Sequence, residues 1–116
     1  MTSENDIQKQ IMDAAANLDG VTLYRNNTGA AKMGKRWVKF GLCKGSSDLI
    51  GWTEVEISPD MVGETVAVFT AIEVKKPGGK TTYEQIEFGD SVIRAGGKFG
   101  VAESVDEALD IVEGLD

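Results

Sequence analysis

Three charged side chains are spaced in the sequence so that together they could hydrolyse a phosphodiester bond. Glu73 and Lys75 lie two residues apart in Ile72-Glu-Val-Lys75, and on a strand such residues project to the same face. Asp48 follows Gly45-Ser-Ser47 and opens a second expected strand. Two carboxylates repel one another unless a cation lies between them, and Mg²⁺ or Mn²⁺ suits oxygen ligands while retaining water that can become the nucleophile. A nearby lysine could stabilise the charge that develops on a phosphate.

Each of these features also has a simpler interpretation. Glu73 and Lys75 could form an ion pair at the fraying end of a strand. Gln85 shares an expected helical face with Phe88 and Val92, and an inward amide needs partners. Those partners could be a metal-bound water or a phosphate, or the backbone of the core.

The first helix offers a further acid. Glu4 shares a helical face with Ile7 and Ile11 and could reach the same cleft, whereas Asp6 should face elsewhere. We favour Glu4 over Asp6 for this role.

Composition narrows the chemistry. The 116 residues predict a single domain, 1–116, and the absence of histidine excludes histidine-based catalytic sites. One cysteine, Cys43, cannot form an internal disulfide or a zinc finger, and we expect it to be a small buried apolar residue. No apolar run is long enough for a membrane span, and the polar N-terminus does not resemble a signal peptide. The expected compartment is the cytoplasm, or the host cytoplasm for a viral protein.

The charge distribution favours nucleic acid despite a net charge of −7. No Asp or Glu lies between Gly20 and Ser47, yet six of the twelve basic residues do. Such a basic surface could hold phosphates by counterion release. The alternative is an ordinary solvated surface. The basic residues are Arg25, Lys32, Lys35, Arg36, Lys39 and Lys44.

The hydrophobic pattern predicts an α/β domain of order α-β-β-β-β-α-β-α, in which a mixed sheet packs against helices. Ser3 with Asp6, Thr81 with Glu84, and Ser104 with Glu107 resemble capping boxes at the three helix starts. The strand 65–76 is expected to be central and buried on both faces. The predicted helices are 4–18, a segment reaching about residue 95, and one following Ser104; the predicted strands are 21–24, 37–42, 48–57, 65–76 and 99–102, with a polar loop over 25–36.

An ordered set of short motifs resembles the VRR-NUC group of virus-type replication and repair nucleases, within the PD-(D/E)XK nuclease superfamily. The motifs cover most of the chain, from about residue 4 to 106. The proline that precedes the first acid in the superfamily is replaced by Ser47, as the VRR-NUC pattern permits. The motifs are Arg25-Asn-Asn-Thr-Gly29, Phe40-Gly-Leu42, Gly45-Ser-Ser-Asp-Leu-Ile-Gly51, Ile72-Glu-Val-Lys75, Gln85 with Phe88, and Ala95-Gly-Gly97 leading to Val101-Ala102.

The resemblance implies a restriction-endonuclease-like mixed central sheet flanked by helices, and metal-dependent hydrolysis of DNA with Mg²⁺ or Mn²⁺ and no organic cofactor. Asp48 and Glu73 would bind the metal, with the Val74 carbonyl as a further ligand. Lys75 would assist the water or the transition state, and Gln85 would complete the site. The acid on the first helix of the family maps to Glu4, with Asp6 as the alternative. The implied setting is DNA repair or phage replication.

The resemblance leaves the substrate open. A structure-specific endonuclease, acting as a homodimer on four-way or flapped DNA, is our first hypothesis, because no added DNA-binding domain is expected. The alternatives are a less selective nicking enzyme or exonuclease, a non-catalytic DNA-binding or assembly protein, and an acidic interaction protein. Trp37 and Trp52 could stack on bases, although core or dimer contacts are favoured. The expected DNA contacts are Arg25, Asn27, Lys32, Lys35, Arg36, Lys39 and Lys44.

Overall fold

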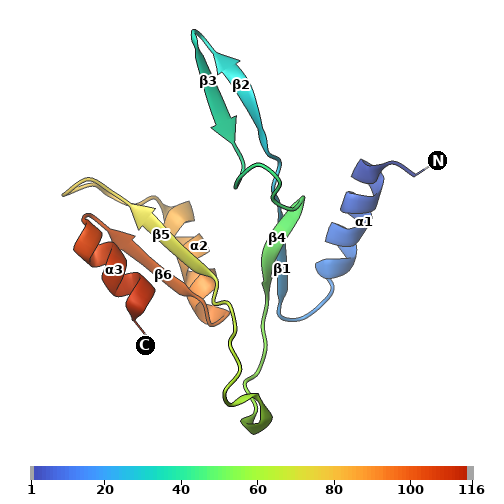
Figure 1. Cartoon of the computed structure of the whole chain (residues 1–116), viewed down its shortest axis with the longest axis vertical. Coiled ribbons are helices and arrows are strands. Elements are labelled where there is room, and N and C mark those ends of the chain that lie inside the picture. Colours follow the sequence, from blue (N-terminus) through green and yellow to red (C-terminus); the bar gives the residue numbers. More distant parts are fainter. Residues whose placement is uncertain (1, 115–116) are drawn as a thin grey trace. The chain divides into compact units, whose positions relative to one another are not determined.

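A computed structural model describes residues 2–114 and shows a small mixed α/β protein (Figure 1). Five strands precede the second helix, rather than the four expected, because Gly29–Met33 within the predicted polar loop is a strand. No helix among the described residues is long and apolar enough to cross a membrane. The elements are α1 Glu4–Ala15, β1 Val21–Arg25, β2 Gly29–Met33, β3 Arg36–Phe40, β4 Leu49–Thr53, the short 3₁₀ helix η1 Pro59–Met61, β5 Thr70–Val74, α2 Tyr83–Arg94, β6 Lys98–Ala102 and α3 Val105–Glu113.

The chain forms two compact units, Met1–Val55 and Glu56–Asp116. The described strands pair two by two, as β1–β4, β2–β3 and β5–β6. The single mixed central sheet expected from the sequence is therefore not confirmed. The assignment of the whole chain to one domain remains a prediction.

In the first unit, β1 and β4 form an antiparallel pair in which Arg25 lies opposite Leu49 and Thr22 opposite Trp52. Tyr24 and Trp52 are diagonal neighbours on one face, with ring centroids 5.9 Å apart. A Cβ at Gly51 would lie 1.8 Å from the Thr22 carbonyl oxygen, so this position requires glycine. Trp52 is thus half-buried and packs on Tyr24 within the unit, outside the fully buried core.

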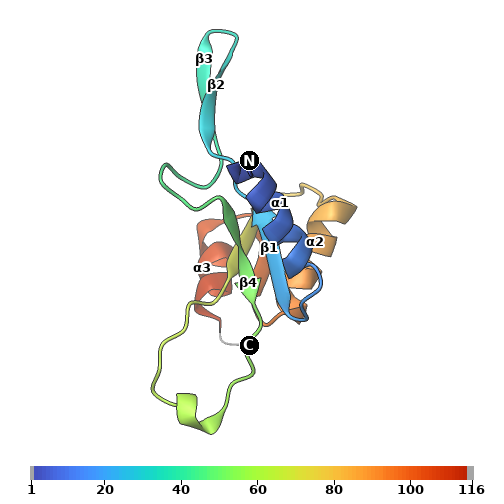
Figure 2. The same cartoon turned by 90° about the vertical axis from the view of Figure 1, so that its right-hand side faces the viewer.

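The strands β2 and β3 form an antiparallel hairpin that extends away from the β1–β4 pair (Figure 2). Met33 lies opposite Arg36, which leaves Gly34-Lys35 as a two-residue loop. Gly34 has a φ of 65°, as the first loop position of a type II′ hairpin requires. The alanine-rich β2 lacks β-branched residues, so its sequence resembled a loop.

The segment between β4 and β5 is less regular than predicted. The expected strand 48–57 ends at Thr53, and the expected strand 65–76 begins only at Thr70. The ladder of β5 with β6 starts at Thr70 opposite Lys98, and just before it the Phe69 carbonyl accepts a hydrogen bond from the Lys98 N–H at 2.8 Å. At η1, two hydrogen bonds hold the pKa of the Asp60 carboxyl below its usual range. The larger effect comes from the Ser58 hydroxyl and the smaller from the backbone N–H of Asp60 itself.

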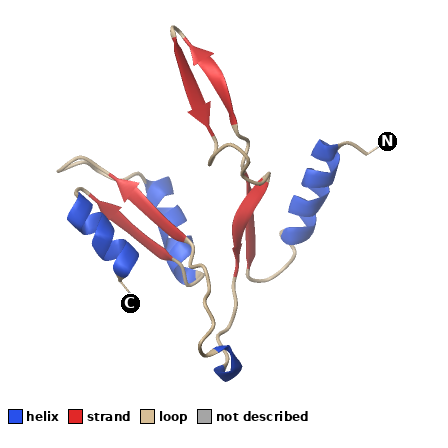
Figure 3. Cartoon of the chain, viewed as in Figure 1, coloured by secondary structure: helices blue, strands red, loops and turns tan. Residues whose placement is uncertain are grey.

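In the second unit, β5 and β6 are parallel and α2 connects them (Figure 3). A Cβ on Gly89 of α2 would lie 2.2 Å from the Phe99 ring, and one on Gly100 of β6 would lie 2.4 Å from Ile111 of α3. Phe99 and Gly100 are adjacent on one strand and point to opposite faces. Therefore α2 covers one face of the pair and α3 the other, and Val92 of α2 is fully buried.

Candidate active site

Glu73 and Lys75 lie together where β5 ends. The Nζ atom of Lys75 is 3.7 Å from a carboxylate oxygen of Glu73, and the side chains are 20% and 29% exposed, respectively. The ion pair that the sequence allowed is therefore present, although it is long and partly open to solvent. Because Ala71 lies opposite Phe99 in the parallel register, residues 71, 73 and 75 project to the Phe99 face, which α2 covers.

The N-terminus of α2 brings Gln85 to this same edge. Gln85, Gly89 and Val92 share one helical face, and the close contact of Gly89 with Phe99 directs that face to the sheet. The chain enters α2 after leaving the carboxyl end of β5, so Gln85 lies in the first turn, near the edge that carries Glu73 and Lys75.

The capping box of α2 also lies one residue later than predicted. Thr82 and Gln85 form it, rather than Thr81 and Glu84, because the helix begins at Tyr83. Gln85 Oε1 accepts a hydrogen bond from the Thr82 N–H at 2.9 Å, while the Thr82 hydroxyl accepts from the Gln85 N–H. The side-chain oxygen of Gln85 therefore has a backbone hydrogen-bond partner, which was one of the two interpretations of this residue. Its amide nitrogen donates no hydrogen bond to the described residues.

Two further groups belong to the carboxyl edge. Val74 is the last residue of β5, so its carbonyl lies beside Glu73 and Lys75 in the chain. Glu103 follows β6, and its carboxylate accepts a hydrogen bond from the Gly78 N–H at 2.7 Å, tying down the loop after β5. No local sequence pattern marks Glu103, because its hydrogen-bond partner lies 25 residues away in the chain.

Asp48 belongs to the first unit, where Asn26 organises its surroundings. The Asn26 N–H donates to the Asp48 carbonyl at 2.8 Å, and the Asn26 Nδ2 donates to the Ser46 hydroxyl and the Ser47 carbonyl. Asp48 itself is exposed, and its carboxylate has no hydrogen bond or ion pair within residues 2–114. Its backbone is thus held while its carboxylate stays open.

Asn26 was not predicted as a site residue. The motif Arg25-Asn-Asn-Thr-Gly29 contained the signal, since a conformation-setting asparagine is common beside turns. The nearby Cys43 is exposed, not buried as expected, because it lies in the turn that Ser46 closes by hydrogen bonding to its backbone.

The structure distinguishes Glu4 from Asp6. The Asp6 carboxylate accepts a hydrogen bond from the Ser3 N–H, which completes the capping box that the sequence predicted. Glu4 lies on the same helical face as the buried Ala15, on the side of α1 that contacts β1. Figures 1 and 2 show that α1 runs antiparallel to β1, so the start of α1, which carries Glu4, lies at the end of β1 that leads to Asn26.

The donor atoms fit a hard divalent cation. Asp48, Glu73 and Glu4 offer carboxylate oxygens, and there is no histidine in the chain. Asp48 and Glu4 belong to the first unit, and Glu73, Lys75 and Gln85 to the second. Within the described residues, no three Asp, Glu or Cys side chains gather into a metal-binding group.

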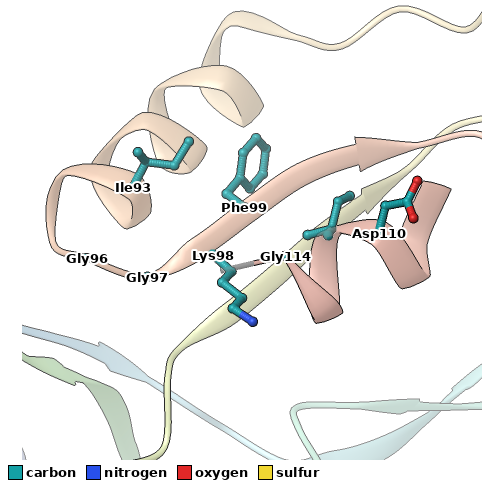
Figure 4. A pocket seen from close by; sticks show the side chains of 8 residues that line it. Ile93, Gly96, Gly97, Lys98, Phe99, Asp110 and Gly114 are labelled. Atoms are coloured by element: carbon teal, nitrogen blue, oxygen red, sulfur yellow. The ribbon is translucent and has the colours of Figure 1, made fainter. Parts of the chain in front are cut away.

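A cavity of about 510 Å³ in the second unit lies at the other end of its sheet (Figure 4). Gly97, Lys98 and Phe99 line it, and Lys98 lies opposite Thr70 at the start of the β5–β6 ladder. In parallel sheets, active sites lie at the carboxyl ends of the strands. The cavity lies at the amino end of the strands and is therefore separate from Glu73 and Lys75, which lie at the carboxyl end.

The basic residues are exposed as expected. Lys32, Arg36 and Lys39 lie in the hairpin strands and Lys35 at its tip, while Arg25 and Asn27 lie before the hairpin and Lys44 after it. None of them forms an ion pair with the residues that the structure describes.

Comparison with known proteins identifies a family but no individual relative. The family model described as VRR-NUC domain matches residues 2–106, across both units and all the candidate site residues. No curated protein and no solved structure matches the chain significantly.

Proposed function

The chain belongs to the VRR-NUC family, and we propose that it is a metal-dependent endonuclease that cuts branched DNA. Family membership makes the protein a nuclease, that is, a hydrolase acting on DNA. The metal dependence, the site residues and the preference for branched substrates belong to the proposal.

One observation carries the assignment of the site. At the carboxyl edge of β5, Glu73 and Lys75 share a half-buried face, and Gln85 approaches from the helix that covers it. A carboxylate and an ammonium kept partly out of water, yet only loosely paired, are suited to a charged ligand. Because the family match contains the Asp48 motif as well, we assign both carboxylates to one metal site.

Each residue then has a defined role. Asp48 and Glu73, with the Val74 carbonyl, would hold Mg²⁺ or Mn²⁺, and the ion would supply an acidified water and neutralise phosphate charge there. Lys75 stabilises the negative charge that grows on the phosphoryl oxygens, or orients the attacking water. Gln85 positions water or phosphate through its amide nitrogen. Glu4 is the additional acid from α1.

We assign a homodimer as the working form, because two identical sites related by a twofold axis can cut the two strands of a junction. The exposed, free Cys43 is consistent with the reducing cytoplasm, where we place the enzyme. Light scattering of the purified chain tests the dimer directly.

The decisive experiment is cleavage of end-labelled four-way junction, flap, linear duplex and single-stranded DNA with Mg²⁺, Mn²⁺ or EDTA. Wild type should cut branched DNA first and lose all activity in EDTA. Equal cutting of every substrate would favour a less selective nicking enzyme, and cutting only from ends an exonuclease. Activity that persists in EDTA would refute the metal site.

A further inference from the structure

The β2–β3 hairpin has two chemically different faces. In its register, Lys32 lies opposite Trp37 and Ala30 opposite Lys39, so these four side chains share one face. The other face carries Gly29, Ala31, Met33, Val38 and Phe40, with Arg36 at the tip. A single tryptophan is thus placed between two lysines on one side of a ribbon, and the apolar residues gather on the opposite side.

The hairpin's own side chains shield part of the apolar face but leave the face with Trp37 open. The Phe40 ring lies over Gly29, where an added Cβ would meet it at 2.7 Å, so part of the apolar face is shielded. Trp37 has no such cover and is 71% exposed. An indole of this size normally buries most of its surface in a core or an interface. Trp37 is therefore the largest uncovered ring on the hairpin.

The charge around Trp37 favours an anionic occupant. Lys32 and Lys39 flank the indole, Lys35 lies at the tip, and the sequence has no acid between Gly20 and Ser47. Lysines and an aromatic ring on a two-stranded ribbon suit phosphates and bases together, since the lysines hold the backbone and the ring stacks on a base. A second copy of this chain, with its net charge of −7, would also complement these lysines, but it offers no row of phosphates beside open base rings, so the lysines and the indole together favour nucleic acid.

The hairpin is also mechanically linked to the candidate metal site. The Asn26 side chain accepts a hydrogen bond from the Leu42 N–H at 2.9 Å at the base of the hairpin, while its backbone N–H holds the Asp48 carbonyl. Asn26 would thus connect a nucleic acid bound along the hairpin to the backbone of Asp48, the first proposed metal ligand.

We propose that Trp37 stacks on an unpaired base of the DNA substrate while Lys32 and Lys39 hold the adjoining phosphates, so that the hairpin selects DNA with unpaired bases at a branch. This inference rests on the proposed nuclease function and narrows its substrate class. The bases of an intact duplex are already stacked and offer no open ring face, whereas a flap or an open junction does.

The test measures binding in EDTA, so that cleavage is not required. Labelled flap DNA and a blunt duplex of equal length are titrated with wild type, Trp37→Thr, Trp37→Phe and Val38→Thr. Threonine preserves strand propensity while removing the ring, and Val38 provides a control on the opposite face. Trp37→Thr should weaken flap binding about 5- to 150-fold, the range for loss of one stacked base. Duplex binding should change far less, and Trp37→Phe should restore most of the affinity.

A second measurement does not depend on the folding of any threonine variant. Trp37 emission, taken as the difference between wild type and Trp37→Phe, should be quenched by flap DNA and not by duplex. Unchanged flap affinity and emission would overturn the proposal. So would a loss of dimer in Trp37→Thr with DNA affinity intact, which would assign the ring to a second copy. Failure of wild type to cleave DNA with metal would refute the nuclease proposal separately, since binding and quenching are read without turnover.

Discussion

The backbone N–H of Asn26 donates a hydrogen bond to the carbonyl oxygen of Asp48 at 2.8 Å, just beyond the last paired residues of β1 and β4. The same asparagine uses its side chain to bind Leu42, Ser46 and Ser47. These hydrogen bonds hold the backbone of the loop that presents Asp48. Asn26 is a positioning residue for the candidate metal site.

Asn26→Ala removes three side-chain hydrogen bonds at a half-buried position. We expect a loss of about 1–3 kcal/mol in the free energy of unfolding, because hydrogen bonds contribute about 1 kcal/mol each. We also expect the Mg²⁺ concentration for half-maximal cleavage to rise, because Asp48 is no longer held. Urea unfolding and a metal titration measure the two effects. Asn17→Ala, which removes one exposed hydrogen bond to Asp13, is the control. A stability loss with an unchanged metal requirement would make Asn26 purely structural.

Glu73→Gln and Asp48→Asn should each abolish cleavage while the protein stays folded. Both remove the charge of a proposed metal ligand at a strand end and little buried volume. Loss of a group that merely supports metal ligands lowers activity about 10- to 100-fold, so loss of a ligand should exceed about 100-fold. Single-turnover cleavage and circular dichroism provide the measurements, with the exposed Glu64→Gln as control. Turnover close to wild type in either variant would remove that residue from the site.

Lys75→Ala should separate metal binding from catalysis. The ammonium lies 3.7 Å from the Glu73 carboxylate, so its removal makes that carboxylate more attractive to a cation. We therefore expect Mn²⁺ to bind more tightly, as measured by calorimetry, while the cleavage rate falls by roughly 100-fold or more. Weaker Mn²⁺ binding together with slower cleavage would instead indicate that Lys75 supports the fold of the site.

Gly89→Ala tests the position of α2, and with it the orientation of Gln85. The added methyl group would lie 2.2 Å from the Phe99 ring, so the helix and sheet would have to separate. We expect a destabilisation of about 1–3 kcal/mol in thermal or urea unfolding, although alanine has the better helix propensity. Asp90→Ala, at the exposed neighbouring position, should be close to neutral. A stabilised Gly89→Ala would mean that α2 does not approach Phe99 so closely.

Neutralising Lys35 and Arg36 together, at the tip of the hairpin, should weaken DNA binding without altering metal affinity. Each lost phosphate contact should lower the slope of log affinity against log salt by about one. Fluorescence anisotropy at several salt concentrations measures this slope. An unchanged slope would show that the tip does not contact phosphates.

Local signals carried much of the fold prediction. The capping pair Ser3 and Asp6 and the apolar spacing of α1 and α3 depend on residues three or four apart, so the sequence displayed them directly. The same local patterns misplaced the start of α2 by one residue, since Thr81 and Thr82 are both acceptable caps and no local pattern selects Thr82. The hairpin was missed because strands such as β2 are stabilised by cross-strand partners rather than by their own residues.

For the candidate site, the sequence by itself determined the chemical groups and their pairing along a strand. Glu73 and Lys75 share a face because strand side chains alternate, and the absence of histidine restricts the metal chemistry to hard oxygen ligands. Only the tertiary structure decided that Gly89 packs against Phe99, that Asn26 holds the Asp48 backbone, and that Trp37 is uncovered between two lysines. These relationships join residues that are not neighbours in the chain. They arise from close packing and strand register, which no local sequence pattern encodes.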